Sequence, residues 1–273
     1  NLSIAESGND KIIMVQTIRN ITLDYAAMKD SQNVLKYSKT MSSILATVMP
    51  KENDYLQENW FAKSIIASAF YHLNMPDSAL YYAKQVNEMK LNTNTVGYAA
   101  FTSQLLGDIY TLKAENDTAF YYYKLAIEYG HNVNASQVVG SSYAGIARIF
   151  QKKGQQDSAL YYARQAFDYY QNNTIIIQAW GENIDSYIAE ISPVLAELYK
   201  ANNQPDSAYK YLKLSVALKD SLYNANKMRQ FQTLTFNEAN RHQQLEQQAN
   251  EVKRQYKTKV KILGLATGLF AVI

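Results

Sequence analysis

A carboxylate, a hydroxyl and two adjacent phenols stand close together in residues 157–163, which read DSALYYA. These groups accept and donate hydrogen bonds, so the segment has the chemistry of a binding motif. Closely related sequences occur at 77–83 (DSALYYA) and 117–123 (DTAFYYY), with a weaker copy at 206–212 (DSAYKYL). Recurrence of this kind indicates a repeat architecture, in which each unit buries its apolar face on its neighbours. We therefore interpret the segment as part of a scaffold.

This interpretation gives each residue type in the repeated segment a structural role. An acidic side chain at the start of a helix accepts hydrogen bonds from unpaired backbone N–H groups, so Asp157 is expected to cap its helix. Ala159 and Ala163 supply the small side chains that a close helix crossing requires. The tyrosine doublets are expected to pack between neighbouring units.

The remaining reactive residue types form no catalytic or metal-binding pattern. No two of the three histidines, His72, His131 and His242, lie four residues apart, and the sequence contains no cysteine. It also contains no glycine-rich phosphate loop, nucleophile elbow or calcium-binding loop. We therefore predict no catalytic residue, no metal site and no cofactor in this segment.

The formal net charge of +3 is distributed unevenly along the chain. Residues 221–261 carry eight basic and three acidic side chains, so the rest of the chain is slightly acidic. A protein that binds nucleic acid through its repeats needs a basic face on them. The charge pattern therefore argues against nucleic acid as a partner of this segment.

The elements that position the repeated segment are predicted to be pairs of helices. The small residue of each copy serves as a register mark, at Val34, Ala79, Ala119, Ala159 and Ala208, with spacings of 45, 40, 40 and 49 residues. Twelve residues before each mark lies a second, mostly small residue, and three positions after that an aromatic one. These offsets place large and small side chains on one helix face. Each unit is therefore predicted to be an antiparallel pair, helix A and helix B.

The third unit carries the fullest set of these residues, namely Leu106, Gly107, Tyr110, Ala119, Tyr123 and Ala126. This pattern resembles the tetratricopeptide repeat (TPR), and the resemblance covers residues 12–219. It implies an all-α fold, a TPR superhelical solenoid of antiparallel helix pairs followed by a long C-terminal helix. The period is about 40 residues instead of 34, so helix B and the next helix A are each predicted to be about one turn longer. The chain lacks the tryptophan usual early in helix A and the proline usual after helix B.

The resemblance implies that the helix A faces line a concave groove that binds a peptide or protein. The register places ten candidate binding residues on those faces: Ser64, Ser68, Tyr71, Gln104, Asp108, Thr111, Arg148, Gln151, Lys152 and Glu197. The chaperone-binding branch of the family carries a clamp of basic and asparagine side chains for a C-terminal carboxylate. The matching positions here do not provide that clamp, so the sequence disfavours an adaptor for chaperone tails.

The fourth and fifth units are joined irregularly. The interval from Ala166 to Ala196 spans 30 residues, against 21 in the neighbouring units, and its surplus includes Trp180, Gly181 and Pro193. Pro193 is expected either to kink helix A of the fifth unit or to delay its start. Two interpretations of the insertion at 167–193 stay open. It belongs to a binding face, or it fits the last repeat to the C-terminal helix.

The predicted domains are a TPR array of about five helix pairs at 1–220, a connecting helix at 221–261 and the start of a truncated transmembrane helix at 262–273. The last segment is apolar, follows a basic flank, and contains Gly264 and Gly268 at a spacing that can pair membrane helices. Twelve residues are too few to cross a bilayer, so a longer protein is expected. A C-terminal core helix or an amphipathic tail is the alternative.

This order of segments resembles the membrane-bound sensor proteins of Bacteroidetes-type bacteria, whose output is a histidine kinase or a DNA-binding domain. The residues FQTLTFNE at 231–238, before a basic and then a glycine-containing apolar stretch, carry this resemblance. It implies a non-catalytic sensing module at the bacterial inner membrane, with periplasmic repeats that bind a peptide or protein. A homodimer through the connecting and membrane helices is a further option. Two alternatives are a cytoplasmic membrane-tethered scaffold, which the basic flank favours, and an enzyme with an unrecognised site.

Overall fold

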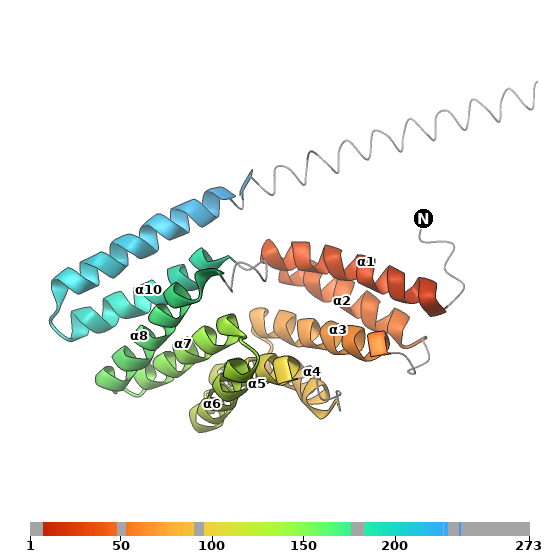
Figure 1. Ribbon diagram of the computed structural model, residues 1–273, viewed down its shortest axis with the longest axis horizontal. Helices are drawn as coiled ribbons and strands as arrows, with labels where there is room; N and C mark the ends of the chain where they lie inside the picture. The colour runs from red at the N-terminus through yellow and green to blue at the C-terminus, as the bar shows by residue number, and fades with distance from the viewer. Residues whose placement is uncertain are drawn as a thin grey trace, which may run out of the picture. The chain divides into compact units, whose positions relative to one another are not determined.

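The computed structural model describes residues 8–47, 53–89, 96–175 and 183–225, together with 227, 228 and 235. Within these ranges every regular element is a helix, which confirms the all-α prediction. In chain order the helices are α1 (Gly8–Ala27), α2 (Ser31–Leu45), α3 (Asn53–His72), α4 (Pro76–Glu88), α5 (Val96–Leu112), α6 (Asn116–Asn132), α7 (Ser136–Lys152), α8 (Gln156–Asn172), α10 (Ile184–Ala201) and a helix at 205–225 (Figure 1).

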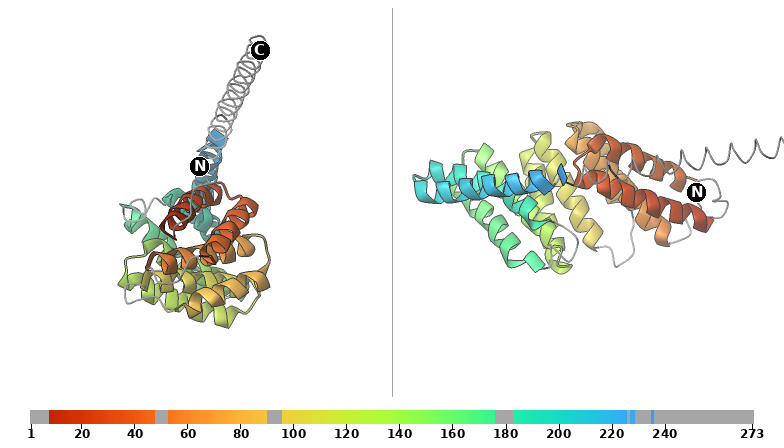
Figure 2. Two further views of the ribbon diagram at one scale, coloured as in Figure 1. Left: turned by 90° about the vertical axis from the view of Figure 1, so that its right-hand side faces the viewer. Right: turned by 90° about the horizontal axis from the view of Figure 1, so that it is seen from above.

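The helices follow one another as pairs. α1 packs on α2, α3 on α4, α5 on α6 and α7 on α8, and α5 also packs on α7 of the next pair (Figures 1 and 2). From α5 to α8 each helix contains 17 residues, and three residues separate it from the next. Two such helices and two such turns make up the 40-residue period. The predicted lengthening of both helices is therefore confirmed.

The turn inside each pair repeats one backbone geometry. Its central residue is left-handed, with φ between 55° and 72°, at Lys29, Asn74, Ala114, Gly154 and Asn203. The next residue donates its N–H to the carbonyl oxygen five positions earlier, at 2.9–3.0 Å. This is the Schellman arrangement that ends a helix and satisfies its last carbonyl groups. Glycine occupies one of the five positions and asparagine, which also tolerates this conformation, occupies two. The packed helix pair therefore imposes a rare conformation on Lys29 and Ala114.

The crossing of helix A and helix B is buried at small residues, as the register predicts. In the fourth pair Ala147 and Ala159 are fully buried. Beside this crossing the rings of Phe150 and Tyr162 stack 5.4 Å apart and 6° from parallel. The same stack occurs in every pair, between Tyr25 and Tyr37, Phe70 and Tyr82, Tyr110 and Tyr122, and Tyr199 and Tyr211. Each stack contributes about 0.5–1.5 kcal/mol beyond the burial of its area.

The two tyrosines of each doublet differ in their surroundings. The second tyrosine makes the stack on helix A of its own pair. The first lies on the surface, and Tyr81, Tyr121 and Tyr161 are 63%, 61% and 57% exposed. The prediction that the doublets pack between units is therefore wrong for the first tyrosine. Successive side chains on a helix point about 100° apart, so only one of the two can face the crossing.

The predicted capping role of the aspartates is also wrong. The N-cap residues of α4 and α8 are Met75 and Gln155, and neither makes a side-chain cap hydrogen bond. The aspartate is the second helical residue, where its charge still favours the helix dipole. Asp117 instead accepts a hydrogen bond from Lys153 Nζ of the next pair at 2.8 Å. Asp77 and Lys113 form the same link one pair earlier, at 2.6 Å.

Pro193 lies inside α10, nine residues after the helix begins at Ile184. The alternative in which the proline delays the start of this helix is therefore wrong. Asn183 caps α10, because its Oδ1 atom accepts the N–H of Asp185 at 2.9 Å. Trp180 and Gly181 fall outside the described residues.

The C-terminal predictions fall mostly outside the described residues as well. The contacts divide the chain into Asn1–Leu222 and Tyr223–Ile273. The predicted membrane segment at 262–273 and nearly all of the connecting helix at 221–261 have no described placement. Among the helices that are described, none has the length and apolar character that a bilayer crossing needs.

Candidate functional site

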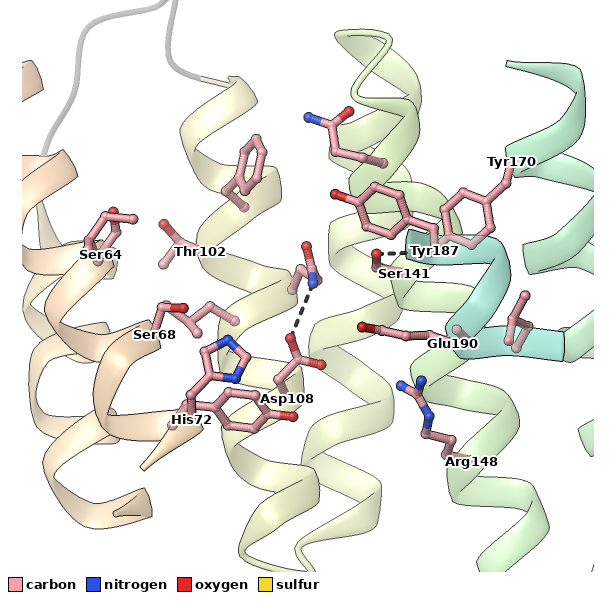
Figure 3. A pocket seen from close by; sticks show the side chains of 18 of the residues that line it. Ser64, Ser68, His72, Thr102, Asp108, Ser141, Arg148, Tyr170, Tyr187 and Glu190 are labelled. Carbon is pink, nitrogen blue, oxygen red and sulfur yellow. Dashed lines mark hydrogen bonds between the residues drawn. The ribbon is translucent and has the colours of Figure 1, made fainter. Parts of the chain in front are cut away.

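The helix A elements share a cavity of about 360 Å³ on one face (Figure 3). It lies between α3, α5, α7 and α10, so four successive helix A elements contribute to it, and α8 adds one side chain. The lining side chains include Trp60, Ser64, Ser68, Tyr71, His72, Phe101, Gln104, Asp108, Gln137, Ser141, Arg148, Tyr170, Tyr187 and Glu190. A cavity of this volume is at the small end of the range for ligand pockets.

Asp108 of α5 is held in the cavity wall by two hydrogen bonds. The Tyr123 hydroxyl donates to Oδ1 at 2.7 Å, and Gln104 Nε2 donates to Oδ2 at 3.2 Å. Burial raises the pKa of Asp108 to about 6; the two hydrogen bonds and Arg148 oppose the rise, whereas Glu190 adds to it. The carboxyl group is therefore mostly ionised at neutral pH and takes up a proton in mildly acidic solution.

The Tyr123 ring comes from helix B, α6, and reaches Asp108 through a gap between α5 and α7. A Cβ atom added to Gly107 of α5 would lie 2.6 Å from this ring, and one added to Gly145 of α7 would lie 2.3 Å from it. Atoms in packed protein interiors do not approach so closely. The ring can occupy this gap only because both facing residues are glycines. Burial raises the pKa of the Tyr123 phenol well above its usual value, so it stays a hydrogen-bond donor.

Tyr170 of α8 reaches the cavity in the same way one pair later. A Cβ atom added to Gly140 of α7 would lie 2.3 Å from its ring. Its hydroxyl is 3.0 Å from Ser141 Oγ, and its ring stacks on Tyr187 of α10 at 5.1 Å. Residues on α7, α8 and α10 are thereby joined at the end of the cavity that the irregular junction forms.

Three polar side chains of the cavity, those of Gln137, Arg148 and Glu190, have no hydrogen-bond or ion-pair partner among the described residues. Gln137 is 5% exposed, and its Oε1 atom accepts no hydrogen bond from the described part of the chain. Arg148 and Glu190 form no ion pair within 4.0 Å with one another or with Asp108. The charged groups of Asp108, Arg148 and Glu190 are directed into the same space (Figure 3). Arg148 is partly buried and Glu190 is exposed, so water solvates them, and of the three unpaired side chains Gln137 alone carries the cost of a buried unpaired polar group.

Comparison with known proteins places the fold. No protein-family model matches the sequence, and no curated protein matches it. Among solved structures, BtubC from P. vanneervenii matches 78% of this chain and 83% of its own at 14% identity, with a TM-score of 0.59. The apo form of RapI matches 80% of this chain and 66% of its own at 15% identity, with a TM-score of 0.53. A kinesin light chain-like protein of P. anserina with nearly identical TPR-like repeats matches 77% and 97% at 16% identity, with a TM-score of 0.50.

The described chain is a TPR-like solenoid. At these identities the comparisons establish the fold alone. They do not assign a ligand.

Six of the ten predicted groove residues of this TPR-like solenoid meet in the cavity, namely Ser64, Ser68, Tyr71, Gln104, Asp108 and Arg148. They come from equivalent positions of α3, α5 and α7, which are neighbours in space although 40 residues apart in the chain. Their role in binding stays a prediction. Burial raises the pKa of the Tyr71 phenol to about 12, so this hydroxyl is neutral at physiological pH.

The other four predicted residues do not line the cavity. Thr111 Oγ1 donates to the Gly107 carbonyl at 2.9 Å, which directs this hydroxyl into its own helix pair. Gln151 Nε2 donates to Glu197 Oε2 at 2.9 Å, and this bond is exposed to solvent. Lys152 is the last residue of α7 and is not among the lining side chains. These residues share the register of the groove but lie at the ends of its helices.

The cavity also contains side chains that the register did not predict. Gln137 and Ser141 lie eleven and seven residues before Arg148 on α7, so the helical period could have placed them on its face. They were missed because α7 begins earlier than helix A of an ordinary TPR. Tyr187 and Glu190 belong to the first turns of α10, within the irregular junction. Their position required the three-dimensional structure, because no repeat-based register extends through an insertion.

Proposed function

We propose that the TPR-like solenoid is a non-catalytic sensing or protein-interaction module, and that the cavity between α3, α5, α7 and α10 binds a peptide or a segment of a protein. The observation that carries this proposal is the cavity itself, in which polar side chains of four successive helix A elements converge. Gln137 Oε1 is one of five buried side-chain oxygens without a partner in the described part of the chain, and Gln137 is the residue among them that lines the cavity. Pockets of this kind, with mostly apolar walls and a few converging polar groups, are the usual form of a binding site.

The test compares peptide binding by the unaltered protein with binding by a variant in which the cavity is filled. Fluorescein-labelled hexapeptide pools, each with one fixed and several randomised positions, would be titrated while fluorescence anisotropy is measured. The Ser68→Phe variant should lose binding by about tenfold or more, because a ring occupies the volume that the peptide needs. Ser43→Phe, an equal change on an exposed position of α2, is the matched control. Equal binding by all three proteins, or binding by none, contradicts the proposal.

A second variant tests the unpartnered acceptor directly. In Gln137→Met a buried polar group with no described partner is replaced by an apolar one of similar length. The free protein should become more stable by about 1 kcal/mol, because the desolvated oxygen is gone. Peptide binding should weaken at the same time. A loss of stability without any change in binding would show that Gln137 has a structural role only.

The wider context is proposed on the sequence order alone. The module would act at the bacterial inner membrane with its repeats in the periplasm, and residues 221–261 would transmit binding to a histidine kinase or DNA-binding output outside this chain. The connecting and membrane segments would pair in a homodimer. Removing residues 221–261 from the full-length protein should leave peptide binding intact and abolish the response of the output domain. A response that survives this deletion contradicts the relay.

A further inference from the structure

The charges in the cavity are not balanced. Asp108 and Glu190 contribute two carboxyl groups from α5 and α10, whereas Arg148 of α7 contributes the single guanidinium group of the lining. Burial lowers the pKa of His72, so its imidazole adds no charge at neutral pH. Glu190 is exposed, whereas Asp108 and Arg148 are partly buried, so Glu190 lies at the solvent side of the lining. The charged groups of the lining therefore carry one negative charge in excess.

We propose that the cavity takes the cationic end of a lysine or arginine side chain of a bound peptide, between Asp108 and Glu190. This inference rests on the function proposed above and specifies the residue that the peptide inserts. A single cation neutralises the excess carboxylate. An inserted anion would instead face two carboxyl groups, with only Arg148 in its favour.

The apolar walls of the cavity suit the stem of the same side chain. Phe101 is 39% exposed, and Trp60 is buried against Tyr98 with its ring centroid 4.3 Å away. Both of these rings line the cavity together with Tyr187. Lysine and arginine carry three or four methylene groups that pack against such surfaces while the charged end reaches a polar partner. The aromatic faces add a favourable electrostatic contact with the cation.

The volume of the cavity also limits the size of the group that it can bind. About 360 Å³ is near the lower bound for a pocket that encloses a small ligand. It accommodates one long side chain with its adjoining backbone, and excludes a folded segment. The peptide is therefore expected to lie along the helix A faces with one residue inserted.

The experiment fixes the chemistry of one peptide position and leaves the others random. N-acetylated and C-amidated hexapeptide pools, which carry no terminal charges, would hold lysine, arginine, norleucine, glutamine or glutamate at the third position. Their dissociation constants at pH 7.5 would be measured by fluorescence anisotropy. The lysine or arginine pool should bind about tenfold more tightly than the norleucine pool, and the glutamate pool should bind most weakly.

Two neutral variants assign this preference to the named carboxyl groups. Glu190→Gln and Asp108→Asn should each reduce the preference for lysine over norleucine by about fivefold or more, with norleucine binding little changed. Glu128→Gln, the same change on the exposed side of α6, is the control and should leave the preference intact. If Asp108→Asn fails to fold, because Tyr123 donates to that carboxylate, Glu190→Gln alone decides.

The outcomes separate this inference from the function on which it rests. Binding that favours the glutamate or the norleucine pool overturns the cationic assignment and leaves the peptide site standing. A lysine preference that persists in both neutral variants overturns it too, because the cation must then bind elsewhere. Absence of binding by every pool, whatever its fixed residue, overturns the proposed function and this inference with it.

Discussion

Two faces of the solenoid differ in how regularly their residues repeat from one helix pair to the next. Where helix B packs on helix A, each pair repeats the same solution, with a small-residue crossing and one aromatic stack such as that of Phe150 on Tyr162. On the groove face, the residue just after the helix A small position is Ser68, Asp108 or Arg148 in α3, α5 and α7. One register position therefore carries a hydroxyl, a carboxylate and a guanidinium. Repetition identifies the scaffold, and its absence identifies the surface that can discriminate between ligands.

The third pair departs from this division, because a residue of its crossing also serves the groove. The neighbouring pairs place alanine opposite alanine, at Ala67 with Ala83 and at Ala147 with Ala163, all fully buried. In the third pair the corresponding positions are Gly107 and Tyr123. The large ring and the missing Cβ compensate for each other, and the exchange brings a phenol to Asp108.

The largest expected effect is the loss of that ring. Tyr123→Ala should lower the free energy of unfolding by about 3–5 kcal/mol, because it leaves a cavity between α5 and α7 and removes the hydrogen bond to Asp108. Chemical denaturation in urea measures the change. In this background Gly107→Ala should stabilise the protein by up to about 1 kcal/mol, since it restores the crossing of the neighbouring pairs and favours the helix.

In the unaltered protein the same Gly107→Ala change should destabilise by about 1–3 kcal/mol, because its Cβ atom meets the Tyr123 ring. The two backgrounds form a double-mutant cycle, and the sign of the effect should reverse between them. A substitution that is favourable in both backgrounds would show that Gly107 is not required by the ring.

A somewhat smaller effect is expected from overfilling a regular crossing. Ala159→Leu places three further heavy atoms at a fully buried site on α8, and should cost about 1–3 kcal/mol in the same denaturation experiment. Tyr161→Leu, two residues further along the same helix at a 57% exposed position, is the control and should change stability much less. Similar values for the two variants would mean that the assigned register is mistaken.

The third effect, on the order of 1 kcal/mol, depends on pH. The pKa of Asp108 is raised by burial from 3.8 to about 6, so the folded state holds its proton more tightly than the unfolded state. The free energy of unfolding should therefore rise as the pH falls from about 6 to about 4, and this residue should add no pH dependence above that window. The groups that face this carboxyl group are Tyr71 of α3, Gln104 of α5, Tyr123 of α6, Arg148 of α7 and Glu190 of α10.

Asp108→Asn isolates this contribution, because the other titrating groups are unchanged. The difference in unfolding free energy between the two proteins should shift in favour of the unaltered protein as the pH is lowered through that range. Paired denaturation curves at pH 4.5 and pH 7 measure it. A difference that is independent of pH would place the folded-state pKa near its ordinary value.

The smallest effect is expected from the lysine–aspartate links between pairs. Asp117 is 95% and Lys153 39% exposed at the side chain, so water and salt screen the pair. Lys153→Ala should leave the denaturation midpoint within experimental error in high salt. A clear loss of stability would mean that these repeated contacts contribute more than their exposure suggests.

The scaffold of the solenoid could be predicted from the amino-acid sequence alone. Period, helix pairing, buried crossings and lengthened helices all depend on residues close together in the chain, repeated often enough for a local signal to stand out. The sequence also supplied six of the cavity residues, because helical register is local. The tyrosine doublets and the aspartates were misjudged where the relevant partner lies on another element, as Lys153 does for Asp117.

Which of the groove residues form a site depends on how the helices pack in three dimensions. The cavity depends on Asp108, Arg148 and Glu190 converging from α5, α7 and α10, and on Tyr170 passing beside Gly140. Each is a single residue without a repeated counterpart, so no repeated sequence pattern predicts it. Burial, and with it the shifted pKa of Asp108, follows from how many helices surround a side chain. That number is a property of the packed solenoid and of no local stretch of sequence.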